Sequence, residues 1–356
     1  MVTIEQDRNL FLDYFNKEGF QYTSEVPLIT EDKSLLFTNS TIIPWKKYLT
    51  GKTPPLQGLY MSQKCLRTHS LKEEISPEMI NERSFGRFLG YFNMVGLLIN
   101  PNSINQLQKQ IYQLLCDEYE ISPDRIKLFT DSKVDFLGDL EKVLTIENDT
   151  MDPSYYYWSY GLNNVEGKGV TFSLKQDEGN FEDVGQLIQI KNLDEVVAYE
   201  FALGLEVFTS KRISNKTYSN WNVGNVTPKD FRFKAYLEAI STFGAALSIP
   251  RELIEKRHKK EIQRLGKRLI DLEDFFQIPC KITEDTLNSF SLVEFGKSIE
   301  NFENPLEILR RNNDKNKSNF SKYISSKSLS LIEAINIGKE TFGLAPEISE
   351  IIYNDI

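Results

Sequence analysis

Apolar side chains near the start of the chain recur at helical spacing and then give way to shorter, strand-like runs. Leu10, Phe11, Tyr14 and Phe15 fall on one helical face and Gly19 supplies a stop, which predicts a helix over residues 4–18. Short extended segments are predicted at residues 22–29 and 34–38, a helical turn at 43–51, a strand at 57–68, and strand-like aromatics giving way to a helix at 82–99.

The remainder of the chain changes from alternating to helical patterns near residue 230. Residues 104–119 predict a helix, residues 121–131 a turn and a strand, and residues 155–210 several antiparallel strands, the last entering a helix. Beyond Phe231 the pattern is helical almost throughout, except that the polar segment 310–328 predicts a loop. The expected fold class is therefore α+β, an antiparallel sheet flanked by helices and followed by an all-helical domain. The predicted domains are residues 1–215 and 228–356.

Composition favours a well-cored globular protein. The chain has 356 residues, of which 40% are hydrophobic, with 23 Phe and 16 Tyr, so it can bury a large core. The formal net charge of -9 argues against non-specific coating of nucleic acid, although a local basic face could still grip a phosphate backbone.

Cysteine usage and the lack of apolar runs point to the cytoplasm. The three cysteines are far apart in the sequence, and the N-terminal residues MVTIEQDRNLF lack the apolar region of a signal peptide. No apolar run approaches the length that spans a bilayer, so no membrane partner is expected. With two histidines and no CxxC pair, no metal-ligating residues are predicted.

Three segments of the first hundred residues carry a family resemblance. FLDYFNKEGFQYTSEVPLITEDKSLLFTNSTIIPWKKYLTG is followed by SQKCLR and then by SFGRFLGYFNMVG. This order resembles the opening of the alanyl-tRNA synthetase catalytic domain, which belongs to the class II aminoacyl-tRNA synthetases. About the first hundred residues match strongly and the next hundred in patches. The resemblance implies binding of an amino acid, alanine or a small analogue, together with ATP and Mg²⁺.

The resemblance assigns the nucleotide-binding residues. An adenylation site must hold a carboxylate against an α-phosphate, and one planar guanidinium can bridge both groups. Arg67, at the end of the predicted strand 57–68, matches the family's catalytic arginine, and Phe92 its adenine platform. Glu206, in the GLE of motif 3, is in register with the family. Arg87 stands where the family has a glutamate and completes the predicted set as a residue that could reach a phosphate from a new direction. The alternatives are a structural ion pair for Arg67, a core aromatic for Phe92 and a solvated strand-end charge for Arg87.

Three further residues match the family's amino-acid pocket. Trp158 resembles the tryptophan that walls this pocket, and Asn192 the asparagine of a neighbouring strand. Glu200 falls where the family has the aspartate that holds the substrate ammonium. Trp158 could equally belong to the core, and Asn192 could cap a turn.

The sequence departs from the family at three polar positions of the nucleotide site. The motif 3 arginine falls on Val207, a glutamate near the magnesium site falls around Thr171, and a glutamate near the adenine amino group falls on Arg87. A valine cannot neutralise a triphosphate, so ATP is expected to bind weakly, differently or not at all.

One helical segment stands out against the acidic chain. Between residues 251 and 269, eight Lys or Arg outnumber three Glu, and an apolar stripe occupies the opposite face. The segment lies where alanyl enzymes have a helical domain that docks the tRNA acceptor stem, and a cationic face suits an RNA backbone recognised by shape. A solvated helix surface is the alternative. The predicted nucleic-acid-binding residues are Lys256, Lys260, Arg264 and Lys267.

Two functions follow from these observations. The first is an ATP-dependent aminoacyl ligase that forms an aminoacyl-adenylate and transfers the aminoacyl group, without editing, to tRNA, a carrier protein or a small amine. The second is a pseudo-synthetase that has lost adenylation and binds tRNA or aminoacyl-tRNA in a regulatory or transfer role. Retention of Arg67 favours the first, and Val207 and Thr171 favour the second.

Overall fold

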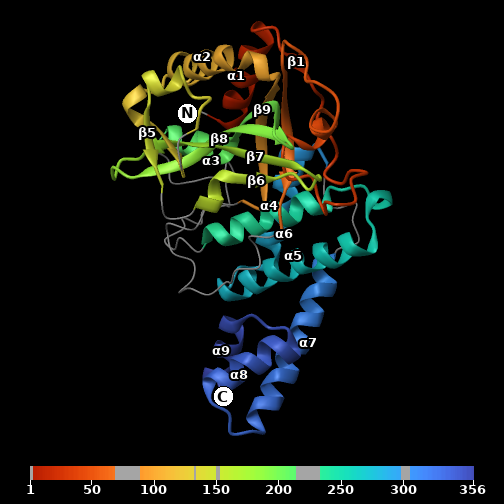
Figure 1. Ribbon diagram of the computed structural model, residues 1–356. Helices are drawn as coiled ribbons and strands as arrows, with labels where there is room; N and C mark the ends of the chain where they lie inside the picture. The colour runs from red at the N-terminus through yellow and green to blue at the C-terminus, as the bar shows by residue number, and fades with distance from the viewer. Residues whose placement is uncertain (1–2, 69–88, 132–133, 150–152, 214–232, 298–304) are drawn as a thin grey trace. The chain divides into compact units, whose positions relative to one another are not determined.

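The structure is a computed structural model that describes residues 3–68, 89–131, 134–149, 153–213, 233–297 and 305–356. The chain divides into two compact units. The first comprises Met1–Cys65 and Phe92–Asn220, and the second comprises Leu66–Tyr91 and Trp221–Ile356. The first unit is built on a β-sheet and the second on helices (Figure 1).

The first unit contains a mixed, mostly antiparallel sheet of nine strands within the described residues. In space the strands follow the order β1-β2-β3-β9-β8-β7-β4-β5, with β6 pairing to β7. The β1–β2 and β4–β5 pairs are parallel, and the β3–β9, β8–β9, β7–β8, β4–β7 and β6–β7 pairs are antiparallel. The strands are β1 (Gln21–Tyr22), β2 (Leu59–Leu66), β3 (Tyr91–Ile99), β4 (Ile126–Thr130), β5 (Thr145–Asn148), β6 (Tyr157–Ser159), β7 (Val165–Lys175), β8 (Phe181–Asn192) and β9 (Glu195–Gly204).

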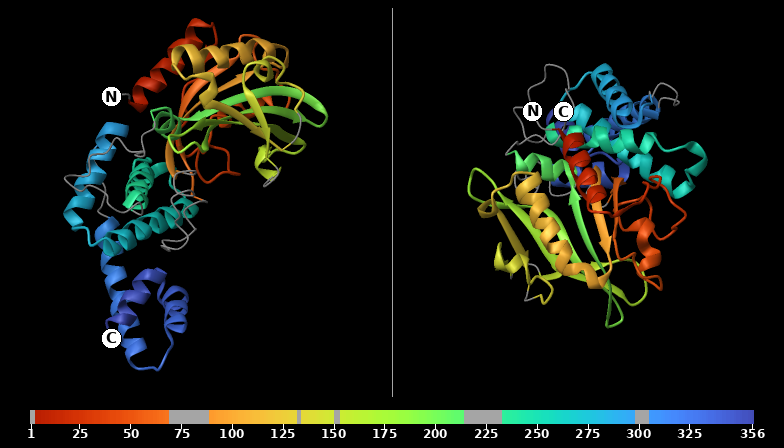
Figure 2. Two further views of the ribbon diagram at one scale, coloured as in Figure 1. Left: turned by 90° about the vertical axis from the view of Figure 1, so that its left-hand side faces the viewer. Right: turned by 90° about the horizontal axis from the view of Figure 1, so that it is seen from above.

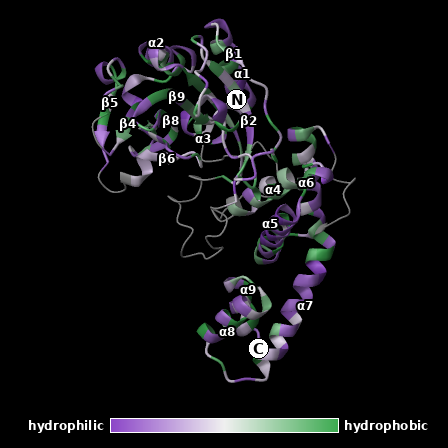
Figure 3. Cartoon of the chain, turned by 45° about the vertical axis from the view of Figure 1, so that its right-hand side comes forward, coloured by the Kyte–Doolittle hydropathy of each residue, from purple (hydrophilic) through white to green (hydrophobic). Residues whose placement is uncertain are grey.

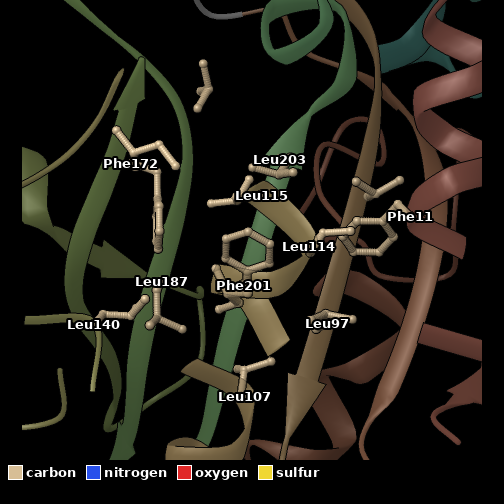
Figure 4. Close-up of a cluster of buried hydrophobic side chains, with 14 of the residues drawn as sticks. Phe11, Leu97, Leu107, Leu114, Leu115, Leu140, Phe172, Leu187, Phe201 and Leu203 are labelled. Carbon is tan, nitrogen blue, oxygen red and sulfur yellow. The ribbon is translucent and has the colours of Figure 1, made fainter. Parts of the chain in front are cut away.

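Helices cover one face of this sheet. Figures 1 and 2 show α1 and α2 side by side over the strands. Side chains from these helices interdigitate with Leu97, Leu187 and Phe201 of the sheet, which are all 0% exposed (Figure 4). This apolar cluster is the main core of the unit. The helices of this unit are α1 (Ile4–Lys17), α2 (Ile104–Gln113), which continues into the π-helical turn η4 (Leu114–Glu118), and α3 (Leu205–Arg212). The 3-10 turn η1 (Ile43–Tyr48) packs in a second apolar cluster, which contains Trp45, Tyr160 and Ile188.

The second unit is helical. Arg310 joins three of its helices, because its guanidinium donates to both carboxylate oxygens of Glu273 at 2.9 and 2.8 Å and to Glu284 at 2.7 Å. A separate apolar cluster around Phe320 unites α7, α8 and α9. The helices are α4 (Phe233–Leu247), α5 (Lys256–Phe275), α6 (Cys280–Phe295), α7 (Pro305–Ser325), α8 (Leu331–Ile337) and α9 (Pro346–Asn354).

The structure confirms the predicted α+β class and most of the elements. The helix predicted at residues 4–18 is α1, the strand predicted at 57–68 is β2, and the alternating region 155–210 folds into β7, β8 and β9 and enters α3. The helical segment that contains the basic residues begins at Lys256 rather than near residue 250, after a 3-10 turn at Arg251–Leu253.

Two predictions within the first unit were wrong. The apolar run that ends at Ile99 does not turn into a helix: β3 continues to Ile99, which pairs with Tyr199. A continuous apolar run fits a strand covered on both faces as well as it fits a helix. Residues 34–38 are irregular rather than extended, because Thr38 bonds back to the 27–28 segment and Phe37 is buried.

The polar segment 310–328 is also not a loop, since α7 runs through most of it. Figure 3 shows how hydrophilic α7 is. Its apolar residues Phe320 and Ile324 are buried, and Asn313 is only 3% exposed and donates to Asp274 at 3.0 Å. The polar composition suggested a solvated loop, whereas polar side chains such as Asn313 bind this helix to a neighbouring helix.

The ion pair between α1 and α3 provides a stability test. Asp7 and Arg212 are 2% and 15% exposed and lie 2.5 Å apart, whereas Glu5 and Arg8 on α1 are 71% and 31% exposed. Arg212→Ala leaves a buried carboxylate without its cation and should cost about 3 kcal/mol of unfolding free energy. Arg8→Ala, the matched control, should cost less than about 0.5 kcal/mol. Urea unfolding measures both, and equal losses would contradict the assignment.

Candidate functional site

Two small residues, Gly96 and Ala202, lie side by side on β3 and β9 in the middle of the sheet face opposite the helices. Gln186 of β8 and Thr171 of β7 continue this row. A side chain at Gly96 would be blocked, because an added Cβ would lie 2.4 Å from the Thr41 Oγ1 atom. The glycine at position 96 therefore leaves space on this face of the sheet, and the Thr41 side chain packs into that space.

Glu200 lies on the same face, between Leu98 of β3 and Ile188 of β8. Its side chain is buried, with the residue 4% exposed, and the Tyr160 hydroxyl donates to Oε2 at 3.2 Å. Among the described residues no cationic side chain pairs with this carboxyl group. Burial raises the pKa of Glu200 to about 7, and the hydroxyls of Tyr160 and Thr41 oppose that shift only in part.

A cation placed beside a buried carboxyl group favours its ionised form. Ionisation of Glu200 costs free energy in the apo protein, and an ammonium group placed beside it would offset that cost. Glycine backbone lies close by: a Cβ at Gly167 would sit 3.0 Å from the Tyr160 hydroxyl oxygen. The sequence singled out Glu200 but not Tyr160 or Thr41, which carry no motif of their own.

The other two predicted pocket residues lie on the same part of the sheet. Trp158 of β6 pairs with Gly167 and packs, half-buried, against the apolar cluster that contains Tyr160 and Ile188. Asn192 ends β8, and its side-chain amide donates to the Leu49 carbonyl at 2.9 Å. This bond gives Asn192 a role in holding the segment after η1, which matches the turn-cap alternative.

The predicted nucleotide residues of the first unit lie where β3 begins. The Glu206 carboxylate accepts the Asn93 backbone N–H at 2.9 Å on each oxygen and the Asn93 side-chain amide at 2.9 Å. Phe92 is 6% exposed and, by strand alternation, faces the same way as Gly96. Glu206 thus ties the first turn of α3 to β3 beside the candidate adenine platform.

The departures from the family also have a structural counterpart. Val207 packs against the main apolar core instead of presenting a charge. Thr171 is 1% exposed and its hydroxyl has no hydrogen-bond partner in the described part of the chain. Within the described residues, no group of three His, Cys, Asp or Glu side chains could hold a metal ion.

The second unit contains Arg67, the first residue after β2. Arg67 is half-buried, and its backbone N–H donates to the Gly90 carbonyl at 2.6 Å. Arg87 lies outside the described residues.

The four predicted nucleic-acid-binding residues divide into two pairs on α5. Lys256 and Lys260 are exposed at its N-terminal end, one helical turn apart. Arg264 instead pairs with Glu261 and donates to the Thr68 carbonyl at 3.3 Å, and Lys267 pairs with Asp271 at 2.7 Å. In the described part of the chain no helix is long and apolar enough to cross a membrane.

Residues 6–192 match the family model of the class II (A) tRNA synthetases, and the chain belongs to that family. Among its relatives, the alanine-tRNA ligase of Caulobacter vibrioides is 27% identical over 168 residues, which are 45% of this chain and 19% of that protein. The alanine-tRNA ligase of Mesoplasma florum is 30% identical over 188 residues, 52% of this chain and 18% of that protein. The alignments thus span less than a fifth of these relatives' lengths.

Solved structures give a looser likeness. The apo histidyl-tRNA synthetase of S. aureus overlaps 74% of this chain and 85% of that chain with a TM-score of 0.37 and 11% identity. The similarity to alanine-tRNA ligases confirms the predicted resemblance at the level of the catalytic domain.

The raised pKa of Glu200 predicts how the stability of the folded protein depends on pH. The folded protein holds a proton on Glu200 up to about pH 7, whereas the unfolded chain loses it near 4.5, so this group's contribution to stability falls as pH rises through that interval. Glu200→Gln removes the titration. The variant should gain up to about 3 kcal/mol relative to the native protein between pH 5 and pH 8.

Urea unfolding at both pH values measures this gain. Glu195→Gln, at an exposed position on the same strand, is the control and should show no such difference. A stability difference between Glu200→Gln and the native protein that does not change with pH would show that Glu200 is ionised throughout.

Proposed function

We propose that this chain binds a small amino acid, alanine or a close analogue, and activates it with ATP as an aminoacyl-adenylate. The supporting observation is the buried Glu200 carboxyl group, which faces Tyr160 and has no cationic partner among the described residues. The α-ammonium group of an amino acid would supply the missing charge. Trp158 and the adjoining apolar cluster would enclose the small side chain.

In the proposed reaction the substrate carboxylate oxygen attacks the α-phosphorus of ATP, and pyrophosphate leaves. Arg67 holds the carboxylate and the α-phosphate against their mutual repulsion, since its guanidinium can donate to both. Phe92 stacks beneath adenine, and Glu206 keeps β3 in place through Asn93. The aminoacyl group then passes to tRNA or another acceptor.

A specific observation favours the second candidate, a binding protein that no longer forms the adenylate. The motif 3 position of the phosphate-binding arginine is Val207, whose side chain packs into the core. A protein of this kind would retain recognition of an amino acid or aminoacyl group and lack the charge that neutralises triphosphate. The two candidates differ in whether ATP is cleaved.

Exchange of labelled pyrophosphate into ATP, measured with a panel of amino acids, separates the candidates. We expect exchange that depends on alanine or a small analogue. Arg67→Ala should reduce it by about a hundredfold or more, because a charge-assisted contact at the reacting phosphate is lost. Arg311→Ala is the control, since Arg311 is exposed on α7 and pairs with Glu307. A folded native protein that gives no exchange with any amino acid would support the second candidate.

Acceptor binding is tested on α5. Lys256→Glu with Lys260→Glu reverses two exposed cations, and we expect weaker tRNA binding and a salt dependence shallower by about two phosphate contacts. Lys315→Glu with Lys339→Glu, at exposed positions on α7 and after α8, applies the same charge change elsewhere. Fluorescence anisotropy at several salt concentrations gives both quantities. Equal losses in the two double variants would mean that net charge, and not this helix end, governs binding.

A further inference from the structure

The residues beside Arg67 are held by side chains from three helices of the second unit. Gly90, whose carbonyl accepts the Arg67 N–H, donates its own N–H to Glu238 Oε1 on α4 at 2.8 Å. Arg268 on α5 donates to the other Glu238 oxygen at 3.2 Å. The Thr68 carbonyl accepts from Arg264, also on α5.

A second set of contacts fixes the next residue. The Tyr91 hydroxyl donates to Glu294 on α6 at 2.7 Å, and its ring meets the rings of Phe290 and Phe295 edge-on or tilted, with centroids 5.4 and 5.8 Å away. Both chain segments that flank residues 69–88 are therefore bound to helices that follow them by more than 140 positions in the sequence.

The side chains that make these contacts are largely shielded from solvent. Glu238 is 8% exposed, and the Arg268 side chain is 16% exposed. Gly90 leaves no room for a side chain, since an added Cβ would lie 2.3 Å from Thr242 Oγ1 and 2.8 Å from its Cγ2. A buried ion pair that accepts a backbone N–H fixes the position of that backbone, because moving it would leave a buried charge unsatisfied.

We infer that Glu238, Arg264 and Arg268 are positioning residues that hold the backbone of Arg67. These contacts from α4 and α5 fix the point from which the guanidinium side chain extends. The clamp defined by Glu238, Arg268, Gly90 and Thr242 acts on Arg67 through the Gly90 carbonyl. This inference rests on the proposed function for its catalytic consequence, although the clamp itself can be tested without activity.

The first test is amide hydrogen exchange at Arg67 in the full chain. Gly90→Ala forces the new methyl group against Thr242 and should speed exchange of the Arg67 amide by about tenfold or more. Adding Thr242→Ala removes the two closest colliding atoms, leaves Glu238 Oε1 at 3.0 Å from the new methyl group, and should restore most of the protection. Gly138→Ala is the matched control, because nothing lies within 4 Å of a Cβ at that position. Unchanged protection in Gly90→Ala, or no restoration in the double variant, would overturn the inference.

Glu238 provides the same comparison if Gly90→Ala fails to fold. Glu238→Gln keeps a carbonyl oxygen for the Gly90 N–H, whereas Glu238→Ala removes it. We expect the glutamine variant to protect the Arg67 amide better than the alanine variant. Equal protection of the Arg67 amide in the two variants would show that Glu238 does not hold this backbone.

The second test is pyrophosphate exchange in a double-mutant cycle. Gly90→Ala should lower kcat by about tenfold in the native background and have no further effect beside Arg67→Ala, because both changes disable the same contact. Losses that multiply would mean that Gly90 acts on the fold and not through Arg67. Absence of exchange in the native protein would refute the proposed adenylation alone, since the amide measurement still decides the clamp.

Discussion

Strand β9 carries Glu200 on one face and Phe201 on the other, and its register with β3 and β8 decides which environment each side chain meets. Leu98 and Ile188 flank Glu200, while Leu97 and Leu187 flank Phe201 in the core. A slip of one residue would exchange the two faces and drive the carboxyl group into the main apolar cluster. The core therefore specifies the site: the burial of Phe201 fixes the register that places Glu200 beside Tyr160.

The amino-acid part and the nucleotide part of the proposed site differ in the contacts that their residues make. In the first part, the buried Glu200 carboxyl group accepts a hydrogen bond from the Tyr160 hydroxyl, on the sheet face that carries Gly96 and Ala202. In the second part, Val207 packs against the core, and Glu206 accepts hydrogen bonds from Asn93. A helix turn with valine at this position gains apolar burial and offers no charge to a phosphate.

The sequence predicted the elements whose patterns are set by local burial. It identified α1, β2 and the strands up to β9. The role of Glu200, which rests on the motif 3 register, stays a prediction. It failed where long-range contacts decide the outcome. The run ending at Ile99 is a strand because β9 lies beside it, and α7 is a helix because Arg310 and Asn313 find acidic partners on other helices. Tyr160 and Thr41 reach Glu200 through tertiary packing, which no spacing rule encodes.

Helix α5 shows why a basic cluster cannot be interpreted from composition alone. Eight cations in its vicinity looked like one surface, yet they serve different ends. Arg268 forms an ion pair with buried Glu238, and Lys267 forms one with Asp271. Arg264 donates a hydrogen bond to the Thr68 carbonyl. Only a charge that is free of such partners can exchange counterions with a phosphate backbone at low cost. Lys256 and Lys260, at the N-terminal end of α5, are exposed and form no ion pair with the described residues. The helix therefore offers charge at this end, and Arg264 and Arg268 hold the Arg67 segment further along.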